Sequence, residues 1–92
     1  MPEDVKKKIE VVTRMFDQII NDRTVPRNIK SAVGEAKSYV HDESIKDLEE
    51  KISSAISILD EIINDPNMPM YTRTQIWNIV SMLESLRSRS KH

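Results

Sequence analysis

Apolar residues recur along the chain at steps of three and four. Over residues 5–19 the steps are 4, 3, 4 and 3, and residues 29–40, 45–63 and 72–86 show the same kind of spacing. This period places the apolar side chains on one face of an α-helix, whereas a half-buried strand requires strict alternation. The pattern therefore predicts four amphipathic helices.

The signals that separate these helices occur in pairs. The first and third helices are expected to end at Asn21-Asp22 and Asn64-Asp65, because asparagine tolerates the left-handed conformation at a helix end. Thr24-Val25-Pro26 and Asn67-Met68-Pro69 follow, and each offers an N-cap side chain and a first-turn proline to the next helix. The second and fourth helices are therefore predicted to begin in the same way.

The chain is built from two copies of one unit, 43 residues apart. Residues 16–26 and 59–69 align with six identities in eleven columns. The units span about 3–41 and 44–86, and 87–92 form a basic tail; Ser44 followed by Asp47 resembles a capping box at the start of the second helix pair. Loops of about 3–5 residues force neighbouring helices to be antiparallel. We predict a single all-α domain, a compact four-helix up-down bundle of two αα-hairpins.

The repeated unit is similar to a HEAT-type repeat. Ile62-Ile63-Asn64-Asp65-Pro66 followed by Arg73 is similar to that family's acidic-proline turn and the basic residue after it. Ile29-Lys30-Ser31-Ala32 with Ala36 is similar to the pattern of its second helix. This resemblance implies that each hairpin is a HEAT-like unit.

A closer resemblance is to a small archaeal family of unknown function, uncharacterised protein family zero-one-four-seven. It rests on Thr24-Val25-Pro26-Arg27-Asn28-Ile29 and on a second segment from Ala55-Ile56-Ser57-Ile58-Leu59-Asp60-Glu61 through Asn64-Asp65-Pro66-Asn67-Met68-Pro69 to Thr72-Arg73-Thr74-Gln75-Ile76-Trp77-Asn78. The resemblance covers nearly the whole chain except the last few residues. It implies a compact helical fold and an archaeal, cytosolic source. It implies no activity, because the family has none assigned.

Composition excludes several classes of function. The 92 residues include no cysteine and one glycine. Disulfides, thiol nucleophiles and thiolate metal sites are thereby absent, and a glycine-rich phosphate loop or nucleophile elbow is very improbable. No stretch approaches the ~18 consecutive apolar residues of a membrane span, and the N-terminus does not resemble a signal peptide. We expect a cytoplasmic protein that does not enter a membrane.

Polar residues form no recognisable catalytic or metal-binding motif. Carboxylates are plentiful, but the Glu-x-x-His pairs of di-metal bundles do not occur, and His41 and His92 lie in a connector and at the terminus. The repeated Asn-Asp pairs are interpreted as helix ends. We therefore predict no enzymatic activity, no metal and no cofactor.

Charge is distributed unevenly. Residues 42–65 hold eight Asp or Glu and two Lys or Arg, whereas residues 1–41 and 66–92 have net charges of +2 and +3. One interpretation is complementarity between neighbouring helices; the alternative is contact with RNA phosphates, as in an RNA- or ribosome-associated accessory protein. The candidate contacts for this alternative are Arg23, Arg27, Lys30, Lys37, Arg87, Arg89 and Lys91. The whole chain has a net charge of −1, and no aromatic platform interleaves these charges.

Apolar residues outside the core stripes suggest an interaction surface. By the ~100° step of an α-helix, Met15 and Ile58 fall nearly opposite the core centres of their helices, at equivalent positions of the repeat. Met70 and Trp77 lie a heptad apart on the flank of the fourth helix's core stripe. Trp77 is either a core-edge residue that closes one end of the bundle or an exposed anchor. Two units also fall short of the ~3 that a solenoid needs, which favours self-association or closure into a bundle.

The one glycine, Gly34, stands where the second unit has Trp77. The smallest and the largest side chain at equivalent positions suggest a size-complementary contact, either between the two units or across a dimer. The leading hypothesis is a non-enzymatic protein–protein interaction or self-assembly module, either a homo-oligomer or bound to another protein. Its candidate contacts are Met15, Gly34, Ile58, Met70 and Trp77.

Overall fold

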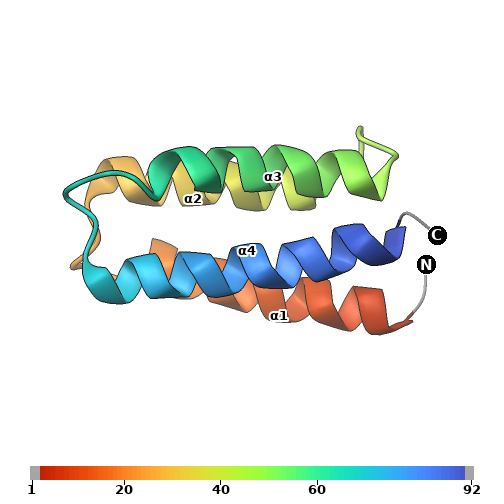
Figure 1. Cartoon of the computed structure of the whole chain (residues 1–92), viewed down its shortest axis with the longest axis horizontal. Helices are drawn as coiled ribbons and strands as arrows, with labels where there is room; N and C mark the ends of the chain where they lie inside the picture. Colours follow the sequence, from red (N-terminus) through yellow and green to blue (C-terminus); the bar gives the residue numbers. More distant parts are fainter. Residues whose placement is uncertain (1–2, 91–92) are drawn as a thin grey trace.

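Four helices make up the regular structure of the described part of the chain. The computed structural model describes residues 3–90, with side chains over 4–87, and this range contains no strand. The helices are α1 (Glu3–Ile20), α2 (Arg27–Val40), α3 (Leu48–Ile62) and α4 (Met70–Ser90). They alternate in direction, so that the α1–α2 and α3–α4 turns lie at one end of the molecule (Figure 1). The predicted all-α, up-down bundle is confirmed.

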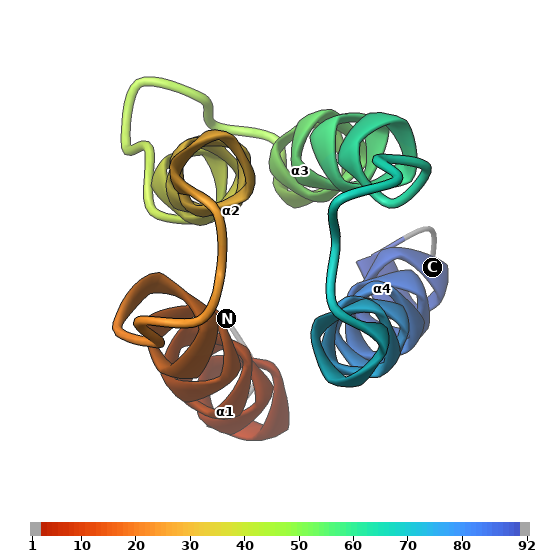
Figure 2. The ribbon, with the colours of Figure 1, turned by 90° about the vertical axis from the view of Figure 1, so that its left-hand side faces the viewer.

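The helices occupy the corners of a square when seen along their axes (Figure 2). Each helix packs closely on two neighbours, α1 closes the ring by packing on α4, and the backbones of the diagonal pairs α1/α3 and α2/α4 do not approach each other closely. Since the second hairpin repeats the first, the two are related by an approximate two-fold axis parallel to the helices. The HEAT-like resemblance finds no support in this packing, because the equivalent helices α1 and α3 do not lie side by side.

The core is formed by equivalent residues of the two hairpins. Phe16 of α1 and Leu59 of α3 are fully buried, as are Val33 of α2 and Ile76 of α4. Full burial of such a side chain contributes about 1.5–3 kcal/mol. The core also includes Val25 and Met68 from the two turns that follow the Asn-Asp pairs. The repeat therefore specifies the interior and not only the helix pattern.

The two turns share one hydrogen-bonding scheme. The Asp22 carboxylate accepts the backbone N–H of Thr24 (2.9 Å), and the Asp65 carboxylate accepts that of Asn67 (2.8 Å). The helices begin only after the prolines, at Arg27 and Met70, so the prediction that Thr24 and Asn67 act as N-caps is wrong. No residue in the described range has a positive φ, so neither asparagine adopts the left-handed conformation that the sequence predicted.

Helix α3 begins later than the capping-box pattern predicted. The backbone N–H and the hydroxyl of Ser44 both donate to Asp42 (2.9 and 2.6 Å), which holds residues 42–44 in a turn. Asp47 is the N-cap instead, and its carboxylate accepts the Glu49 N–H at 3.0 Å. Ile45, which the spacing placed in the helix, therefore precedes it.

Helix α4 is longer than its equivalent in the first hairpin. It continues to Ser90, so the first part of the predicted basic tail is helical. The tail beyond Ser90, with Lys91, lies outside the described residues.

Candidate interaction surfaces

The first half of α4 exposes large apolar side chains. Met70 is 72% exposed, Tyr71 70% and Trp77 58%. In steps of ~100°, Met70 and Trp77 lie about 140–160° from the centre of the buried stripe of α4. Their predicted position on the flank of that stripe is wrong, and so is the core-edge interpretation of Trp77. Both residues point outward.

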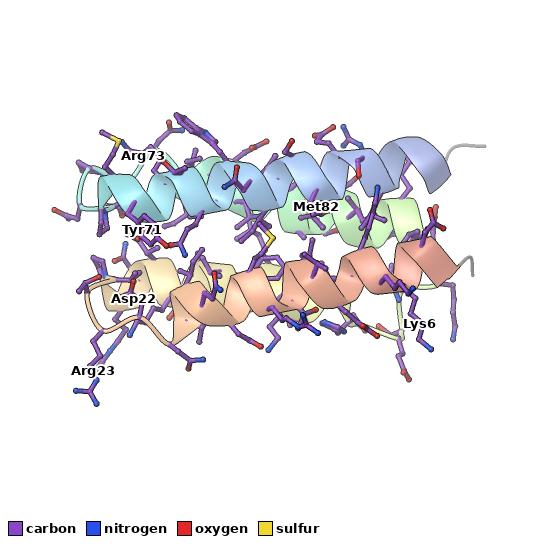
Figure 3. The ribbon with its side chains drawn as sticks, turned by 90° about the horizontal axis from the view of Figure 1, so that it is seen from below. Lys6, Asp22, Arg23, Tyr71, Arg73 and Met82 are labelled. Atoms are coloured by element: carbon purple, nitrogen blue, oxygen red, sulfur yellow. The ribbon has the colours of Figure 1, made fainter. Side chains whose placement is uncertain are left out.

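The exposed residues between Met70 and Leu83 are all uncharged. We call them the α4 face; they are Met70, Tyr71, Thr74, Trp77, Asn78 and Ser81. Arg73 is the charged residue of this segment and is half-buried. It donates from Nε to the Ile63 carbonyl and from Nη2 to the Asp65 carbonyl, both at 3.1 Å. Tyr71 and Arg73 leave α4 on opposite sides, with Tyr71 toward α1 (Figure 3), so the arginine closes the end of α3 while the α4 face remains neutral.

Tyr71 is part of this surface although the sequence reasoning did not select it. Its equivalent in the first hairpin is Asn28, a polar residue that is also exposed. A position occupied by asparagine in one copy does not need an apolar side chain for folding. Comparing Tyr71 with Asn28 therefore identifies Tyr71 from the sequence as an apolar residue that the fold does not need.

Met15 and Ile58 lie in the seams between helices. Both are half-buried and pack against the core, so their predicted position opposite the core centre is wrong. Each helix of a square bundle is covered from two directions, and a side chain about 80–100° from the core centre still contacts a neighbouring helix. Ile58 lines a groove between α3 and α2, with Glu35. Met15 lines the equivalent groove between α1 and α4, where Met82 also lies (Figure 3).

Gly34 has open space beside it. A Cβ built on Gly34 would meet nothing within 4 Å. Its predicted contact with Trp77 between the two units is therefore wrong: α2 and α4 lie at diagonal corners of the bundle (Figure 2), and Trp77 is more than half exposed. A contact across a dimer stays a prediction.

The candidate nucleic-acid contacts are not gathered into one patch. Arg23 and Arg27 are exposed near the α1–α2 turn, at the end of the molecule where Figure 3 shows Arg23. Arg87 lies toward the opposite end and pairs with Glu84 at 2.9 Å. Lys37 pairs with Asp17 of α1 at 2.6 Å, and Lys30 is half-buried. The side chain of Arg89 and all of Lys91 lie outside the described residues.

The repeated aspartates have structural partners. Two hydrogen bonds from Thr24 hold the pKa of Asp22 below its ordinary value, the larger effect coming from the hydroxyl and the smaller from the backbone N–H. Ser44 lowers the pKa of Asp42 in the same way. Asp65 also accepts the Asn28 amide at 2.7 Å, which links the α3–α4 turn to the start of α2. These contacts support the interpretation of the Asn-Asp pairs as helix ends.

Two kinds of feature are absent from residues 3–90. Their His, Asp and Glu side chains form no group of three or more that is suited to a metal ion. None of the helices in this range combines the length and the hydrophobicity that crossing a bilayer requires.

Comparison with known proteins places this geometry in a family. The model of the Uncharacterised protein family (UPF0147) matches residues 1–86. A UPF0147 protein of Methanocaldococcus jannaschii is 53% identical over 86 residues, covering 94% of this chain and 88% of the relative. One of Archaeoglobus fulgidus is 44% identical over 81 residues, covering 88% and 91%.

Two solved structures have the same fold. The crystal structure of the unknown-function protein MMP1188 is 47% identical, with a TM-score of 0.81 and coverage of 85% of this chain and 88% of that one. A UPF0147 protein from Thermoplasma acidophilum is 31% identical, also with a TM-score of 0.81, covering 88% and 94%.

The fold and the α4 face define a small all-α bundle protein with one neutral, partly aromatic helix surface. The chain belongs to the UPF0147 family, and the relatives named above by organism are archaeal. The predicted family resemblance is confirmed, and the names of these relatives state no activity.

Proposed function

We propose that this protein is a protein–protein interaction module whose contact surface is the α4 face. The observation that carries the proposal is the position of Trp77, more than half exposed on the outer side of α4, the helix that also exposes Met70 and Tyr71. Tryptophan, tyrosine and methionine are enriched at the centres of protein interfaces, where charged residues are depleted. The α4 face has this composition.

The first hairpin serves as an internal control for this argument. At the positions equivalent to Met70, Tyr71 and Trp77, helix α2 has Arg27, Asn28 and Gly34. Each hairpin builds one of two equivalent halves of the bundle, yet only the second has large apolar side chains at these exposed positions. The fold therefore does not require them, which supports a role in contact with another molecule.

Site-specific photo-crosslinking tests this proposal. A benzoylphenylalanine is placed at Thr74, at the centre of the α4 face, and in a matched variant at Ser31, the equivalent exposed position of α2. Each variant is irradiated in an archaeal cell lysate. We expect protein adducts, with the chain itself or with other proteins, at position 74 and far fewer at position 31. Equal yields at both positions would overturn the proposal, and adducts formed only with RNA would favour the nucleic-acid alternative.

A further inference from the structure

We infer that the occupant of the α4 face is a second copy of this chain, bound antiparallel across a two-fold axis at Thr74. This inference rests on the proposed function, because it assumes that the α4 face is a contact surface. It adds the identity of the partner and the register of the contact.

The spacing of large and small side chains on α4 is self-complementary. Met70, Thr74, Trp77 and Ser81 follow steps of four, three and four, so they form one stripe along the helix. Met70 and Trp77 are about 10.5 Å apart along the axis, with Thr74 between them. A two-fold axis between Arg73 and Thr74 places each Trp77 opposite the partner's Met70, and the small Thr74 at the crossing.

The charge of the face also fits a second copy. None of the exposed residues from Met70 to Leu83 is charged, and the guanidinium of Arg73 is engaged with two carbonyls of its own chain. Two such faces meet without repulsion and without burying an unpaired charge. The outer faces of the other helices differ, since α1 exposes Lys7 and Arg14, and α3 exposes Asp60 and Glu61.

The exposed area is sufficient for a weak dimer. Given that aromatic side chains bury 150–250 Å² each, the exposed parts of Tyr71 and Trp77 offer roughly 150 Å² each. With Met70 and the smaller residues, the α4 face offers about 600 Å² per copy, which is the lower end of the range for specific interfaces. We therefore expect association at micromolar rather than nanomolar concentrations.

Another arrangement of two copies is possible in principle. In this arrangement, the Trp77 side chain of one copy fills the open space beside Gly34 of the next copy. Because α2 and α4 face opposite directions, that contact is heterologous and generates chains or rings rather than a closed dimer. The self-complementary stripe and the exposed positive charge of Arg27 near Gly34 favour the symmetric arrangement.

Disulfide trapping distinguishes these arrangements, because the chain has no cysteine of its own. In the purified Thr74→Cys variant, the cysteine at position 74 should lie next to the same cysteine of the second chain across the two-fold axis. Two Cβ atoms about 4 Å apart can then form a disulfide. Ser31→Cys is the matched control on α2. Under mild oxidation, we expect Thr74→Cys to form a disulfide-linked dimer at least tenfold faster than Ser31→Cys, and adding Trp77→Ser to remove this difference.

Three outcomes would overturn the inference. Equal rates for the two cysteine variants would exclude the α4–α4 contact. Faster crosslinking in a mixture of Thr74→Cys and Ser31→Cys than in Thr74→Cys alone would favour the heterologous contact. Absence of Thr74→Cys dimers in the purified protein, with protein adducts at position 74 in lysate, would refute self-association and leave the proposed function in place.

Discussion

Trp77 and Gly34 occupy equivalent positions of the two hairpins and point away from each other on diagonally opposite helices. The exposed fraction of Trp77 is 58%, and nothing lies within 4 Å of where a Gly34 side chain would begin. Neither position is needed to fill the core. The difference between the two copies therefore concerns the surface of the molecule.

Trp77→Ser should leave stability nearly unchanged. The indole is outside the core, and serine has a similar helix propensity, so the free energy of unfolding should change by no more than about 0.5 kcal/mol. Urea unfolding followed by circular dichroism at a low protein concentration measures it. The neighbouring Ile76→Ala is the control, and should cost about 2–5 kcal/mol because Ile76 is fully buried. A loss of several kcal/mol in Trp77→Ser would mean that the side chain belongs to the core.

Gly34→Ala should stabilise the protein. Glycine in a helix interior costs about 0.5–1 kcal/mol relative to alanine, and the added methyl group meets no other atom within 4 Å. The midpoint of thermal unfolding should therefore rise. A lower midpoint would show that the space beside Gly34 is occupied in solution.

Arg73→Ala should destabilise the bundle by about 1–3 kcal/mol. The change removes two charged hydrogen bonds to the carbonyls of Ile63 and Asp65, at the end of α3. The equivalent residue of the first hairpin is Lys30, for which Lys30→Ala should cost about 0.5 kcal/mol or less. Urea unfolding of both variants compares the two turns. Equal losses of unfolding free energy in the two variants would mean that the two hydrogen bonds of Arg73 add nothing to the effect of its positive charge.

The carboxyl groups of Asp22 and Asp42 should titrate below the ordinary value of 3.8. Because the folded pKa is lowered, the stabilisation from each carboxylate is present above the ordinary value and is lost as the pH falls through the lowered folded pKa. Thr24→Val removes the hydroxyl that contributes most, so the pKa of Asp22 should rise while that of Asp42 stays the same. Carboxyl-carbon NMR titration measures both. An unchanged pKa of Asp22 would contradict the role of the hydroxyl.

The sequence predicted the fold because the 43-residue offset applies to the core and the turns alike. Helices α2 and α4 begin at Arg27 and Met70, 43 residues apart. The sequence predicted that the third helix includes Ile45, whereas α3 begins at Leu48. Hydrogen bonds from Ser44 to Asp42 hold residues 42–44 in a turn just before Ile45, and apolar spacing does not reveal such a local turn.

The surface was harder to predict than the core. The outward prediction for Met15 and Ile58 misapplied helical spacing, because the ~100° step puts both only about 80–100° from the centres of their stripes, where a neighbouring helix of the square bundle covers them. Met70 and Trp77 were selected correctly as apolar residues outside the core stripe, and the ~100° step from Thr72, Ile76, Ile79, Leu83 and Leu86 already places them on the outer side of the helix rather than on its flank. The repeat contained better information, since Asn28 and Gly34 identify positions where the fold needs no apolar side chain.

Sedimentation velocity over a concentration series from micromolar to millimolar tests whether the α4 face joins two copies of this chain. We expect the wild-type chain to pass reversibly from monomer to dimer, and Trp77→Ser to remain monomeric throughout. Identical sedimentation of the two proteins over the whole series would contradict the claim that the α4 face joins two copies of this chain.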